Sequence, residues 1–173
     1  MKNEEINELI TCPKIIINPP KKNFKIINGS EQNSMTLVCK DDKNLIFAVR
    51  LRKHIKFFEN FSIMLDLYVP TLDKEIKLIR FNGNHGGEHT NKVINNLSFD
   101  SGFHIHKTTE EALNAGIRPE HYAELTNKYT TFEEALIAFW KDVNLLDDID
   151  DYFKGYDISK LPLFKSLNTG SIT

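Results

Sequence analysis

The sequence predicts an α+β fold, with a curved antiparallel sheet of about five strands covered on one face by C-terminal helices. Between residues 35 and 81, four successive runs place an apolar residue at every second position, which is the period of a strand with one buried face. After residue 107 the period becomes that of an amphipathic helix. The chain has 173 residues, 40% of them hydrophobic and 27% charged. This composition is typical of one globular domain spanning 1–173.

The first 34 residues are expected to form a short helix and an extended connection. Ile6, Leu9 and Ile10 share one face of a helix over residues 2–10, and Pro13 prevents it from continuing. Residues 12–34 combine further prolines with short apolar runs, which predicts a largely extended path into the sheet.

The sheet is expected over residues 35–107. Runs 35–40 and 45–53 form a hairpin around a polar turn, and runs 62–69 and 75–81 extend the sheet by two strands. Alternation in the second run places Phe47, Val49 and Leu51 on one face and Arg50 and Arg52 on the other. A glycine-rich, polar, histidine-bearing loop follows over residues 82–102, and 103–107 is the fifth strand.

Residues 108–146 are expected to be helical. A first helix begins with Thr108 and Glu111 in capping-box spacing and stops at Gly116. Pro119 predicts the start of a second helix that reaches about residue 128. A third helix is capped by Thr131, and its apolar residues recur at helical spacing through residue 143. Residues 147–173 form an acidic, then aromatic and proline-interrupted tail.

Charge and cysteine content narrow the class of protein. Residues 12–107 carry 15 basic and 9 acidic side chains, whereas residues 110–157 carry 4 basic and 12 acidic ones. A basic sheet that faces a polyanion explains this asymmetry, and so does a surface that charged residues simply solvate. Two cysteines are too few for a disulfide scaffold, and no apolar run is long enough to cross a bilayer. We therefore expect a cytoplasmic protein without a signal peptide or membrane contact.

The histidines are the candidates for chemistry. His104 and His106 alternate on the fifth strand and therefore share one face, and a folded-back loop brings His89 and Asn91 near them. Two imidazoles in such a site can act as general base and general acid on an RNA phosphodiester. Arg80 or Lys107 would then stabilise the developing charge without a metal. In this interpretation Tyr122 assists proton transfer, and Arg50 and Arg52 bind phosphate.

The same residues allow two other interpretations. His89, His104 and His106 can hold zinc with one position open for water, although only Glu88 and Glu110 are nearby in sequence as a carboxylate base. Histidines in a strand and a polar loop also serve simply as hydrogen-bonding or surface residues. Spacing alone leaves these alternatives open.

The order of several segments resembles an uncharacterised bacterial family that is often associated with prophages. The resemblance runs from Cys12-Pro13 to about residue 145. It is most specific at His89-Thr90-Asn91, a His-x-Asn motif, and at His104-Ile105-His106, a His-x-His motif. After Asn91 the chain departs from the pattern, because Lys92-Val93-Ile94 replaces an expected Pro-Asp-Gly turn. The resemblance implies a shared polar site and, by analogy, a toxin or counter-defence role.

The sequence thus favours a small metal-independent endoribonuclease that acts on RNA or a ribonucleoprotein, as a toxin or as a counter-defence factor of a mobile element. The first alternative is a non-enzymatic inhibitor of the anti-CRISPR or anti-defence type. In that interpretation the acidic helical half binds a basic host defence protein. The second alternative is a zinc hydrolase at His89, His104 and His106.

Overall fold

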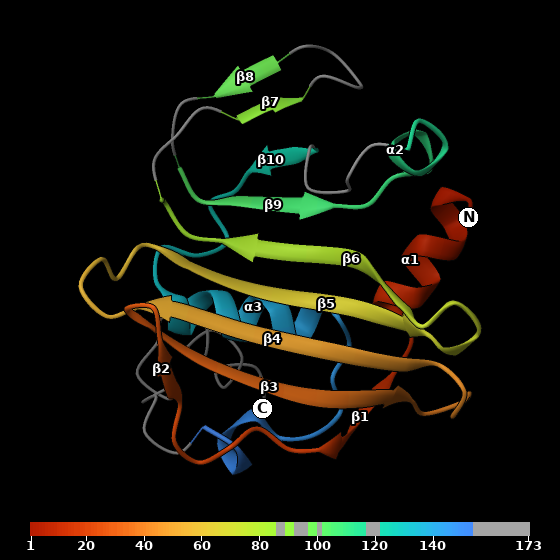
Figure 1. Ribbon diagram of the computed structural model, residues 1–173, viewed down its shortest axis with the longest axis horizontal. Coiled ribbons are helices and arrows are strands. Elements are labelled where there is room, and N and C mark those ends of the chain that lie inside the picture. The colour runs from red at the N-terminus through yellow and green to blue at the C-terminus, as the bar shows by residue number, and fades with distance from the viewer. Residues whose placement is uncertain (86–88, 92–96, 100–101, 117–121, 154–173) are drawn as a thin grey trace, which may run out of the picture.

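An eight-stranded antiparallel sheet dominates the computed structural model (Figure 1). The structure describes residues 1–85, 89–91, 97–99, 102–116 and 122–153, and for 89–91 and 97–99 it describes the backbone only. The strand order is β1-β3-β4-β5-β6-β9-β10, and β2 also pairs with β3. The bounds of these strands are β1 Lys14–Asn18, β2 Lys25–Ile27, β3 Ser30–Cys39, β4 Ile46–His54, β5 Phe61–Val69, β6 Lys74–Asn82, β9 His104–Lys107 and β10 Ala123–Leu125.

The remaining described elements are a separate ribbon and a few helices. Strands β7 and β8 pair only with each other in the described part of the chain. The bounds of these elements are β7 His89–Asn91, β8 Leu97–Phe99, α1 Asn3–Thr11, α2 Glu110–Asn114, α3 Phe132–Asp142, and the 3₁₀ turns η1 Pro70–Leu72 and η3 Ile149–Asp151. None of the described helices is long and apolar enough to span a membrane.

The predicted fold class holds, but the number of strands was wrong. The expected extended connection, residues 12–34, contains β1 and β2, which pair with opposite halves of β3. The helix expected over 119–128 is replaced at residues 123–125 by β10, which pairs with the edge of β9. Residues 117–121 lie outside the described part of the chain. Pairing along an open strand edge satisfies backbone groups that a short helix would leave exposed.

The other helix predictions agree with the structure except at one cap. Helix α3 begins where Thr131 accepts a hydrogen bond from the backbone of Glu134, at 3.1 Å. In α2 this role belongs to Thr109 rather than Thr108, because the Thr108 hydroxyl donates to the Lys77 carbonyl instead. Gly116 has a φ of +63° directly after α2, which is the left-handed conformation that ends helices.

The hydrophobic core lies between one face of the sheet and the helices. Helix α3 lies behind β4 and β5 in Figure 1, and α1 also packs its buried Ile6 and Ile10 into this core. We call this side of the sheet the helix face. Alternation places every second residue of the central strands here, as predicted. The fully buried residues of these strands include Phe47, Val49, Leu51, Ile63, Leu65 and Phe81.

Candidate active site on the polar face of the sheet

The side of the sheet opposite the helices carries two rows of polar side chains, and we call it the polar face. In the first row, His106 pairs with Arg80, Arg80 with Met64, and Met64 with Arg50. In the second row, His104 pairs with Asn82, Asn82 with Ser62, and Ser62 with Arg52. Directly paired residues share a face, with their Cβ atoms about 5 Å apart. The sheet therefore brings together five of the predicted site residues from three strands.

His104 is fixed by hydrogen bonds on both ring nitrogens. Its Nδ1 lies 2.8 Å from the Gly102 carbonyl, and its Nε2 lies 3.1 Å from the amide nitrogen of Asn82. A carbonyl only accepts and an amide nitrogen only donates, so these partners select the neutral ring with its proton on Nδ1. The ring is 1% exposed. These contacts suit a residue that positions its neighbours.

Three imidazoles are in contact in this region. The ring of His104 lies 5.0 Å from that of His106 and 5.1 Å from that of His85, both in edge-to-face geometry. His106 is 3% exposed, whereas His85 is exposed. Sequence reasoning missed His85 because its position depends on the close approach of Gly83 to the backbone of Glu59. A Cβ at Gly83 would lie 1.8 Å from the Glu59 carbonyl oxygen, so only glycine lets the chain pass here.

Two of the predicted residues lie on the helix face instead. Lys107 follows His106 directly on β9, so its side chain points to the opposite side, where its Nζ donates to Asn7 of α1. Tyr122 lines the same 560 Å³ groove as Lys107. Its hydroxyl donates to Glu124, and this hydrogen bond raises the pKa of Tyr122 to about 12. The structure does not bring either residue to His104 and His106.

The metal-binding alternative depends on a residue whose side chain is not described. The backbone of His89 and Asn91 belongs to β7, outside the large sheet. The structure does not describe where their side chains point. Among the residues that the structure describes, no three potential ligands are arranged so that they could hold one metal ion. The zinc site therefore stays a prediction, as does the role of Asn91.

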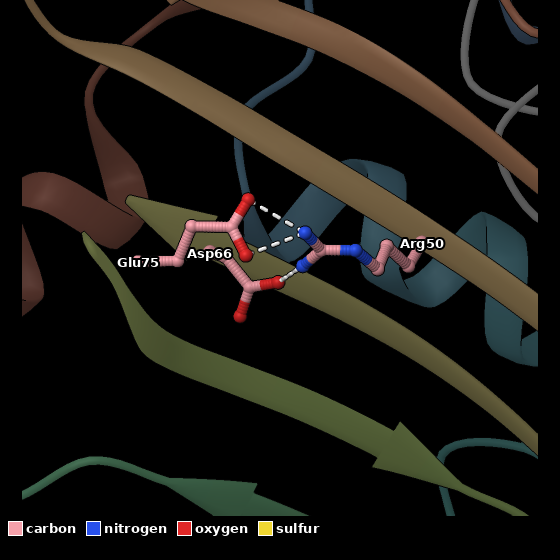
Figure 2. Close-up of polar contacts among 3 residues, drawn as sticks. All are labelled: Arg50, Asp66 and Glu75. Carbon is pink, nitrogen blue, oxygen red and sulfur yellow. Dashed lines mark hydrogen bonds and ion pairs between the residues drawn. The ribbon is translucent and has the colours of Figure 1, made fainter. Parts of the chain in front are cut away.

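The three arginines of the polar face have different surroundings. Figure 2 shows the Arg50 guanidinium directed at the carboxylates of Asp66 and Glu75. Its Nη2 lies 2.6 Å from one Glu75 oxygen. Arg52 instead binds neutral groups, with 2.6 Å to the Asn60 side-chain oxygen. Arg80 is half-buried, and burial together with Arg52 lowers its pKa while Asp66 raises it. Asp66 and Glu75 together therefore neutralise the charge of Arg50.

Asp66 is an unusual carboxylate because burial outweighs its ion pair. Its side chain is 1% exposed, and its Oδ1 has no hydrogen-bond partner among the described residues. Burial raises the pKa of Asp66 to about 6, although Arg50 opposes this shift. The group therefore titrates close to neutral pH.

A basic groove of 420 Å³ continues the polar face toward β2 and β3. Four cationic side chains line it and no acidic one does, namely Lys21, Lys25, Arg50 and Arg52. Its other lining groups are amides, hydroxyls and three apolar side chains, including Met64. Sequence reasoning did not assign Lys21 and Lys25 to the site, because the pairing of β2 with β3 was not predicted. The groove is suited to a polyanion.

Several acidic residues of the helical part are engaged within the molecule. Glu133 binds Lys53 at 2.8 Å, and Asp142 binds Lys128 at 2.6 Å. Glu134 accepts hydrogen bonds from Thr130. An acidic docking surface needs free carboxylates, and these three are used in folding.

No match to the chain is found among known protein families, curated proteins or solved structures. The resemblance to a prophage-associated family accordingly stays a prediction from sequence.

Proposed function

We propose that the protein binds RNA on the polar face and cleaves it without a metal. The observation that carries this proposal is the pair of cross-strand rows, which set His104 and His106 beside Arg80 and Arg52. Arginines bind phosphate and stabilise the charge that develops on it, and imidazoles transfer protons near neutral pH. The basic groove extends the same charged face.

In the proposed reaction the phosphoryl group passes from the 5′-oxygen to the ribose 2′-oxygen. A base removes the proton of the ribose 2′-hydroxyl, the 2′-oxygen bonds to phosphorus, and the 5′-oxygen leaves with a proton from an acid. We assign the two proton transfers to His106 and His85. His104 is a positioning residue, because both of its nitrogens already hold partners. Arg80 is assigned to the phosphorane, since it pairs with His106.

The proposed reaction also requires that the buried His106 becomes accessible to RNA. This side chain is 3% exposed, so a phosphate reaches its nitrogens only when RNA binding opens that part of the polar face. The imidazole NMR signals of His106 should therefore shift when a non-cleavable RNA is bound. Unchanged signals in the complex would argue against this opening.

The inhibitor alternative has less support, because Glu133, Glu134 and Asp142 are engaged within the molecule. A role as a toxin or counter-defence factor is part of the proposal and rests on the family resemblance alone.

The proposal is tested by incubating the protein with structured and total RNA in EDTA. His106→Ala should lower the cleavage rate by about 10²-fold or more. The matched control is Lys107→Ala, the next residue of β9, which points to the helix face and should leave the rate within about twofold. Circular dichroism confirms folding of each variant. Absence of cleavage by the folded wild type, or full activity of His106→Ala, would overturn the proposal.

A further inference from the structure

The loop between β4 and β5 presents apolar side chains to solvent next to the basic groove. Phe57 is 66% exposed and Phe58 67% exposed, whereas most large apolar residues in the described part of the chain are at least partly buried. Ile55 of the same loop donates its backbone N–H to Gly29 at 3.0 Å, which ties the loop to the β2–β3 turn. Ile27, beside that turn, is itself a lining residue of the groove.

The loop is held in one conformation by its own hydrogen bonds. Nδ1 of His54 accepts from the backbone N–H of both Lys56 and Phe57, at 3.1 Å each. Asn60 closes the loop with a backbone bond to the Phe57 carbonyl, at 2.8 Å, and its side chain accepts from Arg52. A groove cation and an exposed aromatic ring are therefore connected through one ordered turn.

The two exposed phenylalanines point to different sides of the sheet. The Phe57 ring packs on the ring of His54, with centroids 4.9 Å apart, and His54 follows Arg52 on the polar face. Phe58 instead lies near Lys53, whose Nζ also contacts Phe132 of α3 on the helix face. Of the pair, Phe57 is the one beside the groove.

We propose that the groove and Phe57 together bind unpaired RNA, with phosphates in the groove and a base stacked on Phe57. This inference rests on the proposed function and names its substrate as single-stranded. In a duplex the faces of the bases are covered by their neighbours, so an aromatic platform distinguishes unpaired strands. The chemistry favours a nucleic acid because Lys25 and Arg52 attract phosphate while the exposed ring attracts a base.

Binding is measured by fluorescence anisotropy with a labelled 2′-O-methyl RNA of about twelve nucleotides, alone and as a duplex. This strand lacks the 2′-hydroxyl needed for cleavage, so binding is read independently of catalysis. The single strand should bind at least about 10-fold more tightly than the duplex. Phe57→Ala should weaken binding of the single strand about 10-fold, and its equally exposed neighbour Phe58→Ala should change it less than about twofold.

The outcomes separate this inference from the proposed function. Equal affinity for both forms, or no effect of Phe57→Ala, would overturn the inference even if RNA is cleaved. The expected binding without any cleavage of unmodified RNA would support the inference and contradict the proposed catalysis. Phe57-dependent binding to phosphatidylserine vesicles, without binding to RNA, would identify a membrane contact and also overturn it.

Discussion

Two consecutive residues of β9 lie in different environments. His106 faces the polar side of the sheet beside Arg80 and His104, whereas Lys107 faces the helices and contacts Asn7. The same contrast occurs on β6, where Phe81 and Asn82 are both buried. Phe81 stacks with Tyr129 at 5.4 Å, but Asn82 contacts the His104 ring.

This contrast indicates which side of the sheet stabilises the fold. Burial of an aromatic ring such as Phe81 stabilises the folded state strongly. Burial of an amide or imidazole contributes little net free energy to folding, even when the group is hydrogen-bonded. The helix face therefore supplies most of the stability. The polar face keeps buried polar groups that folding alone does not require, and such sites are where function is expected.

The largest expected effect is on the helix face. Phe81→Ala should lower the free energy of unfolding by about 3–5 kcal/mol, because it leaves a cavity between β6 and α3. Met64→Ala, on the polar face, should lower it by less than about 1 kcal/mol. Urea denaturation measures both. Similar losses for the two variants would remove the distinction between the faces.

Lys14 tests whether a buried charge can also stabilise the helix face. Its side chain is 0% exposed, and its Nζ donates to the carbonyls of Ile10, at the end of α1, and Val143, at the end of α3. Cations are favourable at helix C-termini, and Lys14→Met leaves these carbonyls without their donor. We expect a loss of about 2–4 kcal/mol in urea denaturation. An unchanged midpoint would show that Lys14 merely tolerates its site.

Asp66 gives the polar face a pH dependence. Its pKa of about 6 in the folded protein lies above the ordinary value near 3.9, so between these values the folded state holds a proton that the unfolded state has released. Stability from this group is present at low pH and is lost as the pH rises through about 6. Relative to Asp66→Asn, the wild type should lose on the order of 2 kcal/mol between about pH 4 and pH 7. Parallel stability curves for the two proteins would contradict this shift.

Tyr129 connects the two faces, and removal of its hydroxyl should affect stability less than the changes at Phe81, Lys14 or Asp66. Its hydroxyl lies 2.9 Å from the His104 carbonyl and 3.1 Å from that of Asn82, where β6 and β9 pair. Tyr129→Phe should cost about 1 kcal/mol and broaden the NMR signal of the His104 ring. If the signal and the stability both stay unchanged, the hydroxyl does not hold these strands.

The elements predicted correctly are those whose apolar residues repeat at a regular spacing within the element itself. Alternation identified β4 and β5 with the correct faces, and helical spacing with Thr131 as cap identified α3. Strands β1 and β10 were missed because their pairing partners are more distant in sequence. Strand β2 was missed although it forms a tight hairpin with β3, because its three residues were interpreted as part of an extended connection. A short run such as residues 123–125 has no period of its own to detect.

Only part of the candidate site could be predicted from the sequence. Alternation correctly placed His104 and His106 on one face, and the same rule applied to Lys107 places it on the other. His85 was missed because its place depends on the close approach of Gly83 to the Glu59 carbonyl. The lysines of β2 and its preceding loop were missed because the short hairpin of β2 and β3, which turns at Asn28 and Gly29, was interpreted as an extended connection.

The central claim, that the polar face is the RNA-binding face, is tested most directly by matched charge reversals. We would measure the affinity of a single-stranded RNA over a range of salt concentrations for Arg52→Glu and Lys107→Glu. Arg52→Glu should weaken binding at least about 10-fold and reduce the salt dependence, whereas Lys107→Glu should change little. Equal losses for the two variants, or a larger loss for Lys107→Glu, would contradict the account.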